Sequence, residues 1–194
     1  MLTLALAGCL DLAGAPTGAP VLTRAELAGG TVVVSPPRGY CIDARSFRER
    51  ASGGFALIGS CASLTGEATG VVVEPTIITI STTPAIQGEV STDSRAFQTA
   101  LGRGQILRAI NRDDGLSLLQ VSGGASIPPS ADQRHWRGLM ALNGQVIGLA
   151  LYAGTDSPMT GDEGMRMMIA LADTIRRDSE AAASTAVQAR TTEE

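Results

Sequence analysis

The fold is decided by the stretch from Trp136 to Ala153, which reads WRGLMALNGQVIGLALYA. Two apolar runs, Trp136–Leu142 and Gln145–Ala153, flank the dipeptide Asn143-Gly144. An Asn-Gly pair between such runs predicts a β-hairpin, because both residues tolerate the positive φ that a type I′ turn requires. Both runs are largely apolar, so we expect this hairpin in the middle of a sheet with both faces partly covered.

Strand patterns dominate the chain upstream of this hairpin. A second hairpin is predicted around Asp114-Gly115, which separates Ile106–Ile110 from Leu116–Val121. Pro75 is expected to break one long apolar stretch into two short strands or to place a bulge in it. The polar residues 45–54 predict a loop. The remaining predicted strands are apolar runs, several of them rich in β-branched residues, and are Thr31–Val34, Phe55–Cys61, Val71–Glu74 and Thr76–Ser81.

Two segments have helical spacing. The first is Asp93–Leu101, and the second follows Thr160-Gly161-Asp162-Glu163, which matches a capping box, and continues to about Arg177. No βαβ alternation is present. The sequence therefore predicts an α+β fold, with an antiparallel sheet of about six to seven strands and two main helices packed on one of its faces.

The segment Trp136–Arg177 resembles the end of PsbP/DcrB-like domains, in which a hairpin leads through a polar loop into a final amphipathic helix. The stretch Ser35–Tyr40 (SPPRGY) is similar to the bend near the start of that fold. This resemblance covers about half of the chain and is one of pattern. It implies a small, non-enzymatic domain that is lipid-tethered or lies in the thylakoid lumen.

The tetrapeptide Leu6-Ala7-Gly8-Cys9 resembles the lipobox of bacterial lipoproteins. In that family an aliphatic residue and two small residues precede a cysteine that is acylated and becomes the mature N-terminus. The resemblance implies a lipid anchor on Cys9 and a protein that faces the periplasm. Leu10, rather than Asp, follows the cysteine, which favours delivery to the outer membrane by enterobacterial sorting rules.

Length and composition predict a single domain. All fifteen basic residues are arginine, as in GC-rich bacterial genomes, and the formal net charge of −4 argues against nucleic-acid binding. We expect a partial signal peptide at residues 1–8, a lipid-tether linker at 9–30, a single α+β domain at 31–180, and a disordered tail at 181–194.

Acylation of Cys9 would leave an even pair of cysteines, Cys41 and Cys61. In an exported protein such a pair is most simply a disulfide. The alternatives are two unpaired buried thiols, or Cys41 as the nucleophile of a hydrolase or redox enzyme with the sole histidine, His135, as its partner.

No motif predicts a catalytic site, a metal centre or a cofactor. The carboxylate pairs Asp113-Asp114 and Asp162-Glu163 lie where turn and capping chemistry already explain them. Surface contacts with an anionic ligand or a protein partner are predicted instead, because arginines gather in one loop and tryptophan is enriched in interfaces. The candidate contact residues are Arg38, Tyr40, Arg45, Arg48 and Trp136.

The sequence thus predicts a membrane-tethered envelope lipoprotein with a non-enzymatic binding role and a possible envelope protein partner. The competing hypothesis is a periplasmic hydrolase or redox enzyme that uses Cys41.

Overall fold

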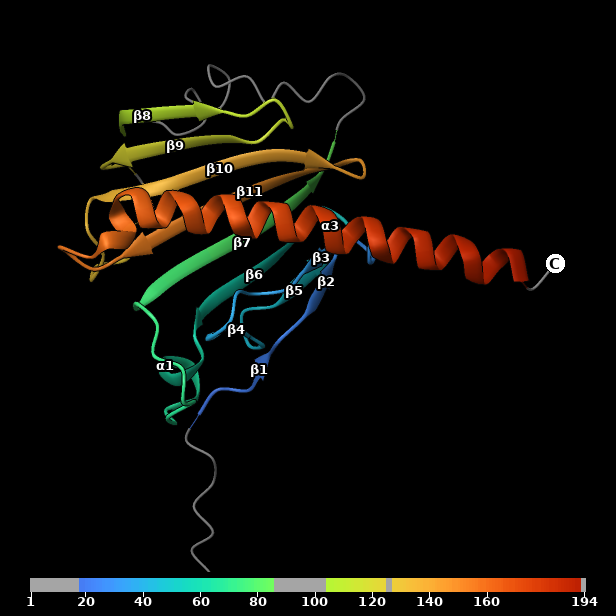
Figure 1. The fold of residues 1–194 in the computed structure, drawn as a ribbon, viewed down its shortest axis with the longest axis horizontal. Helices are drawn as coiled ribbons and strands as arrows, with labels where there is room; N and C mark the ends of the chain where they lie inside the picture. The colour runs from blue at the N-terminus through green and yellow to red at the C-terminus, as the bar shows by residue number, and fades with distance from the viewer. Residues whose placement is uncertain (1–17, 86–103, 125–126, 193–194) are drawn as a thin grey trace, which may run out of the picture.

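Most strands join one antiparallel sheet. The computed structural model describes residues 18–85, 104–124 and 127–192, and in this part of the chain nine strands form a sheet in the order β1-β4-β6-β7-β11-β10-β9-β8, with β5 paired to β6 (Figure 1). A separate two-stranded sheet pairs β2 with β3. The bounds are Val21–Leu22 (β1), Ala25–Leu27 (β2), Val32–Val34 (β3), Tyr40–Asp43 (β4), Arg48–Arg50 (β5), Gly53–Ser60 (β6), Thr76–Pro84 (β7), Gln105–Asn111 (β8), Ser117–Ser122 (β9), Arg134–Leu142 (β10) and Gln145–Ala153 (β11).

The hairpin at Asn143-Gly144 lies inside this sheet and is confirmed. Leu142 pairs with Gln145, and the two turn residues have φ values of 49° and 73°. Its second strand, β11, pairs with β7 over the full length of both, while β10 pairs with β9. The hairpin predicted at Asp114-Gly115 is also confirmed, as β8 and β9.

One long helix, α3 (Asp162–Thr192), covers one face of the sheet (Figure 1). Helix α1 (Cys61–Thr65) and a short 3₁₀ helix, η1 (Pro158–Thr160), are the other helices of the described residues. Met168, Leu171 and Ile175 of α3 are fully buried against the sheet. The predicted α+β class is therefore correct, with more strands than expected and one main helix among the described residues.

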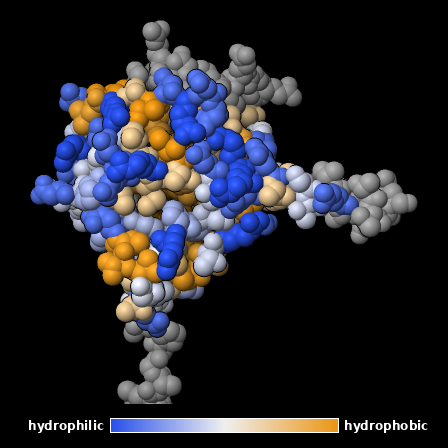
Figure 2. Space-filling model, viewed as in Figure 1, coloured by the Kyte–Doolittle hydropathy of each residue, from blue (hydrophilic) through white to orange (hydrophobic). Residues whose placement is uncertain are grey.

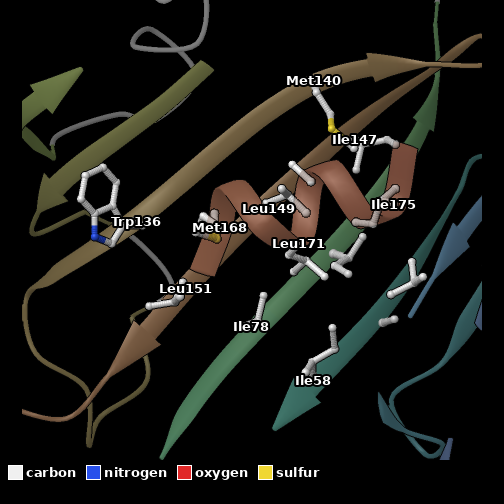
Figure 3. Close-up of a cluster of buried hydrophobic side chains, with 14 of the residues drawn as sticks. Ile58, Ile78, Trp136, Met140, Ile147, Leu149, Leu151, Met168, Leu171 and Ile175 are labelled. Carbon is white, nitrogen blue, oxygen red and sulfur yellow. The ribbon is translucent and has the colours of Figure 1, made fainter. Parts of the chain in front are cut away.

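The hydrophobic core lies between α3 and the sheet (Figure 3). Alternate residues of each central strand point into it, as the two-residue period of a strand requires. Ile58 comes from β6, Ile78 from β7 and Leu151 from β11, and each is fully buried. The neighbours of these residues along each strand point to the opposite face of the sheet.

The N-terminus of α3 is held on the sheet by two side chains. The indole Nε1 of Trp136 donates a hydrogen bond to the carbonyl of Gly161 at 3.0 Å, and Gln120 Nε2 donates to the carbonyl of Thr160 at 2.7 Å. The predicted capping box is not formed. The Thr160 hydroxyl belongs to η1 and donates to the Ser157 carbonyl at 2.9 Å.

The linker predicted at 9–30 is wrong for its described part, because β1 and β2 lie within it. Ala25 and Leu27 are buried in the core. These short strands are stabilised by distant partners, since β1 pairs with β4 and β2 with β3. The loop predicted at 45–54 likewise contains β5, and no strand forms at Val71–Val73.

The tail predicted to be disordered at 181–194 is helical as far as Thr192. Alanine has the highest helix propensity, and extending an existing helix costs far less than starting one, so α3 continues beyond its last core contacts. In Figure 1 this second half of α3 projects past the edge of the sheet. The helix predicted at Asp93–Leu101 lies outside the described residues.

No helix among the described residues is both long enough and apolar enough to cross a bilayer.

Candidate functional site

An apolar groove of about 390 Å³ opens on the face of the sheet opposite α3. Its floor comes from three adjacent strands, with Leu57 on β6, Ile77 on β7 and Tyr152 on β11. Each of these residues directly neighbours a core residue in sequence, so its side chain points away from α3. Ile77 and Tyr152 are paired in register. The lining residues are Leu57, Gly59, Ser60, Ser63, Leu64, Pro75, Thr76, Ile77, Ser130, Ala131, Tyr152, Ala153 and Gly154.

Helix α1 forms one wall of the groove through Ser63 and Leu64. The side chain of Ser60 caps this helix by accepting a hydrogen bond from the backbone N–H of Ser63 at 3.3 Å. Gly66 ends the helix in the left-handed conformation, with φ of 74°. A five-residue helix is too short to be stable alone, so it depends on the contacts that hold it against the sheet.

The predicted disulfide supplies one of these contacts and is confirmed. Cys41 of β4 is bonded to Cys61, the first residue of α1, and their Cα atoms are 4.9 Å apart. The backbone N–H of Cys61 also donates to the Gly39 carbonyl at 2.9 Å. The bond therefore fixes the groove wall to β4, the strand next to the edge strand β1.

Tyr152 is held by two side chains of β10. The His135 ring stacks on it with centroids 5.2 Å apart, and the Arg137 guanidinium lies 5.2 Å from its ring centre. His135 is buried, and its Nδ1 lies 3.0 Å from the Gln133 carbonyl. Burial lowers the pKa of His135, and the nearby charge of Arg137 lowers it further, against an opposing effect of the Gln133 hydrogen bond. The imidazole is therefore neutral at neutral pH.

The chemistry of the groove is that of an apolar receptor. Leucine, isoleucine, proline and tyrosine side chains form its walls, hydroxyl groups lie among them, and none of the lining residues is charged. Among the described residues, no group of three or more His, Cys, Asp or Glu side chains is arranged to hold a metal ion. The groove is thus suited to an uncharged, apolar group.

The arginines predicted to bind a ligand lie at the surface, and two of them have local partners. Arg38, Arg45 and Arg48 are all exposed. The Arg48 guanidinium donates to the backbone carbonyls of Arg45 and Phe47 at 2.6 and 2.7 Å, and the Arg45 side chain pairs with Asp43 at 3.5 Å. Asp43 therefore offsets the charge of Arg45, whereas the Arg48 guanidinium is held by backbone carbonyls and keeps its charge.

The aromatic residues predicted as contacts are buried. Trp136 is 0% exposed and Tyr40 is 5% exposed. The Tyr40 hydroxyl donates to the Glu74 carbonyl at 2.7 Å, and burial raises the pKa of this tyrosine. Both side chains pack inside the domain, so the prediction that they contact a ligand or partner directly is corrected.

The hydrolase hypothesis needs Cys41 and His135 close together. Cys41 is on β4 and His135 on β10, and β6, β7 and β11 lie between these strands. Four strand spacings correspond to about 19 Å across the sheet, which is far beyond hydrogen-bond reach. In addition, Cys41 has no free thiol in the disulfide.

Sequence reasoning missed the groove residues Leu57, Leu64, Ile77 and Tyr152. The sequence did contain a signal, because large apolar residues stand next to core residues along a strand, as Leu57 stands beside Ile58. Such neighbours point to opposite faces, so they indicate strands that are covered on both faces. The lipidation residue Cys9 lies outside the described residues and stays a prediction.

Comparison of the chain with protein-family models, curated proteins and solved structures gives no match.

Proposed function

We propose that this protein is a non-enzymatic binding domain of the bacterial cell envelope, anchored by a lipid on Cys9 and facing the periplasm, with the outer membrane favoured. The observation that carries the binding role is the apolar groove over β6, β7 and β11. Ligand sites are typically concave, mostly apolar and about 300–1,000 Å³ in volume, with a few polar groups that orient the ligand. The groove has each of these properties.

The groove favours a small apolar ligand or one apolar segment of a larger ligand. Its volume of about 390 Å³ lies near the lower end of the usual range. The hydroxyls of Ser63 and Ser130 belong to exposed residues of the lining. A ligand with an apolar chain and a polar head would place the chain over Leu57 and Ile77 and leave its head in water.

The lipid anchor rests on the lipobox resemblance of Leu6–Cys9, and the Cys41–Cys61 disulfide supports an oxidising compartment. Together these features favour the periplasm over the cytoplasm.

Binding is tested with parinaric acid, a fluorescent fatty acid whose emission rises in an apolar site. We expect saturable binding to the wild-type chain, and about tenfold weaker binding to Leu57→Gln, because the change removes apolar area worth about 1.4 kcal/mol. Leu139→Gln is the matched control. Leu139 is also a partly buried leucine on the face opposite α3, but it does not line the groove.

The proposal predicts that the control binds like wild type. Equal losses in both variants, or no saturable binding by the wild-type protein, would contradict a ligand site in the groove. Circular dichroism of both variants checks that the fold is retained.

A further inference from the structure

Three valines form an exposed apolar loop beside α1. Val72 is 100% exposed, and Val71 and Val73 are partly buried. We call Val71–Val73 the valine loop. It has no strand or helix, and its outer two side chains pack around Gly39, where an added Cβ would contact Val71 and Val73. Figure 2 shows hydrophobic residues gathered at the end of the molecule that carries α1.

The three consecutive valines place one fully exposed apolar side chain between two partly buried ones. Among the described residues, the large hydrophobic side chains that are exposed are Leu22, Val72 and Leu107, and Val72 is the most exposed of them. Pro75, which follows Val73 by two residues, lines the groove. The valine loop and the groove therefore share one end of the domain.

The described chain starts at this same end. The backbone N–H of Ala19 donates to the Leu64 carbonyl of α1 at 2.9 Å, and Gly18 lies so close to Thr65 that an added Cβ would collide with it. Gly39, which underlies the valine loop, accepts the backbone hydrogen bond of Cys61 at the other end of α1. Helix α1 thus connects the start of the domain with the valine loop.

The length of the chain limits how far the start of the described domain can lie from Cys9, the proposed anchor residue. Nine residue steps separate Cys9 from Gly18, and a fully extended chain of this length spans at most about 32 Å. If Cys9 carries a lipid, Gly18 at the α1 end lies no more than about 32 Å from the anchor residue.

We propose that the valine loop inserts into the interfacial region of the bilayer in which Cys9 is anchored. This inference rests on the proposed anchoring at Cys9. The charged residues closest in sequence to the valine loop and to Gly39 are Arg38, Glu67 and Glu74, and Glu74 accepts a hydrogen bond from Ser157. With one cation and two anions, the contact is apolar and needs no anionic lipid. One valine loop binds weakly by itself, but a short tether raises its effective concentration at the bilayer.

Insertion of the valine loop would also bring the groove close to the bilayer. Leu64 and Pro75 bring the edge of the groove beside the valine loop, so an inserted loop would place the groove next to the lipid surface. An apolar ligand would then pass between membrane and groove with little exposure to water.

The experiment anchors the full chain chemically. Cys9 is the one cysteine outside the disulfide, so a maleimide phospholipid attached to it gives the proposed anchor whether or not the cell acylates this residue. Vesicles of phosphatidylcholine contain brominated lipids, which quench tryptophan on contact. The probe variant is Val72→Trp, and the matched control is Leu107→Trp, which changes a 45% exposed leucine on the edge strand β8. Trp136 is buried and gives the same background in both.

We expect quenching and a blue-shifted emission for Val72→Trp, with quenching at least twofold stronger than for Leu107→Trp. Equal and weak quenching of both would overturn the inference. So would a blue shift of Val72→Trp without vesicles that depends on protein concentration, because the valine loop would then contact a second copy of the chain. Whether the cell acylates Cys9 is measured separately, from the mass of the protein purified from cells.

Discussion

At the scale of single residues, Trp136 and His135 show how neighbouring side chains on β10 take opposite roles. Trp136 points into the core and donates from Nε1 to the Gly161 carbonyl, which positions the first turn of α3. His135 points to the other face and stacks on Tyr152, which lines the groove. These two consecutive residues therefore support α3 on one face of the sheet and the groove on the other.

The burial of His135 predicts a pH dependence of stability. Its pKa is lowered in the folded state, mainly by burial, whereas an unfolded histidine titrates near 6.5. Between these two values the unfolded chain binds a proton that the folded chain does not, so the free energy of unfolding falls as pH falls from about 6.5. Above that pH the contribution of the neutral ring is complete.

The variant His135→Phe keeps an aromatic ring on Tyr152 and cannot bind this proton. Urea unfolding at several pH values between about 5 and 7 should show a smaller slope for the variant, by up to about 1.4 kcal/mol per pH unit. Carboxylate titrations are common to both proteins and cancel in the comparison. Parallel curves would show that His135 is freely protonated in the folded state.

At the scale of elements, the attachment of α3 to β3 depends on one buried serine. The Ser179 hydroxyl accepts a hydrogen bond from the backbone N–H of Val33 at 2.8 Å and donates to the Ile175 carbonyl at 2.6 Å. Ser179 is 1% exposed, so water cannot replace it. Among the α3 residues whose side chains the structure describes, it is the last buried one before the helix projects beyond the sheet.

We therefore expect Ser179→Ala to lower the free energy of unfolding by about 1–3 kcal/mol, because the N–H of Val33 loses its partner inside the core. Ser184→Ala is the matched control. Ser184 makes the same type of bond, to the Glu180 carbonyl at 2.9 Å, but is exposed. Its replacement should change stability by less than about 0.5 kcal/mol. Similar effects of both changes in urea unfolding would contradict this role of Ser179.

The disulfide is the second link between elements. It closes a loop with a sequence separation of 20 residues between β4 and α1, for which chain entropy predicts a stabilisation of about 3 kcal/mol. The double variant Cys41→Ser, Cys61→Ser should lose about this much stability in urea unfolding. A loss below 1 kcal/mol would show that the other contacts of α1 hold it without the bond.

Turn signals in the sequence were sufficient to predict the two hairpins. Asn143-Gly144 and Asp114-Gly115 predicted their hairpins because turn chemistry is encoded in adjacent residues. The strands β1 and β2 were missed because they are only two and three residues long, and their partners lie elsewhere in the chain. For such strands, pairing rather than propensity determines the structure.

The groove was not predictable for a related reason. Its floor joins Leu57, Ile77 and Tyr152, which the order of the strands brings together and no local pattern connects. The contact role predicted for Trp136 was wrong because its side chain lies on the face of the sheet that α3 covers. Interface statistics favoured a contact role, but its strand directs it under α3. Among the predicted site residues, the structure confirms the disulfide pair, because the number of cysteines left after Cys9 constrains the pairing directly.

At the scale of the whole molecule, the features used in the proposals lie at one end. The start of the described chain, the valine loop, α1 and the edge of the groove are connected by the contacts of Ala19, Gly39 and Leu64. The second half of α3 projects from another side (Figure 1). A lipid on Cys9 would therefore hold the binding end near the bilayer and leave α3 directed elsewhere.

Intact mass spectrometry of the protein purified from its native membranes tests the proposed export and the proposed lipid anchor on Cys9. We expect a chain that begins at Cys9, carries acyl chains there, and gains two mass units when the Cys41–Cys61 bond is reduced. A chain that retains Met1 with an unmodified Cys9 would contradict the proposed anchor.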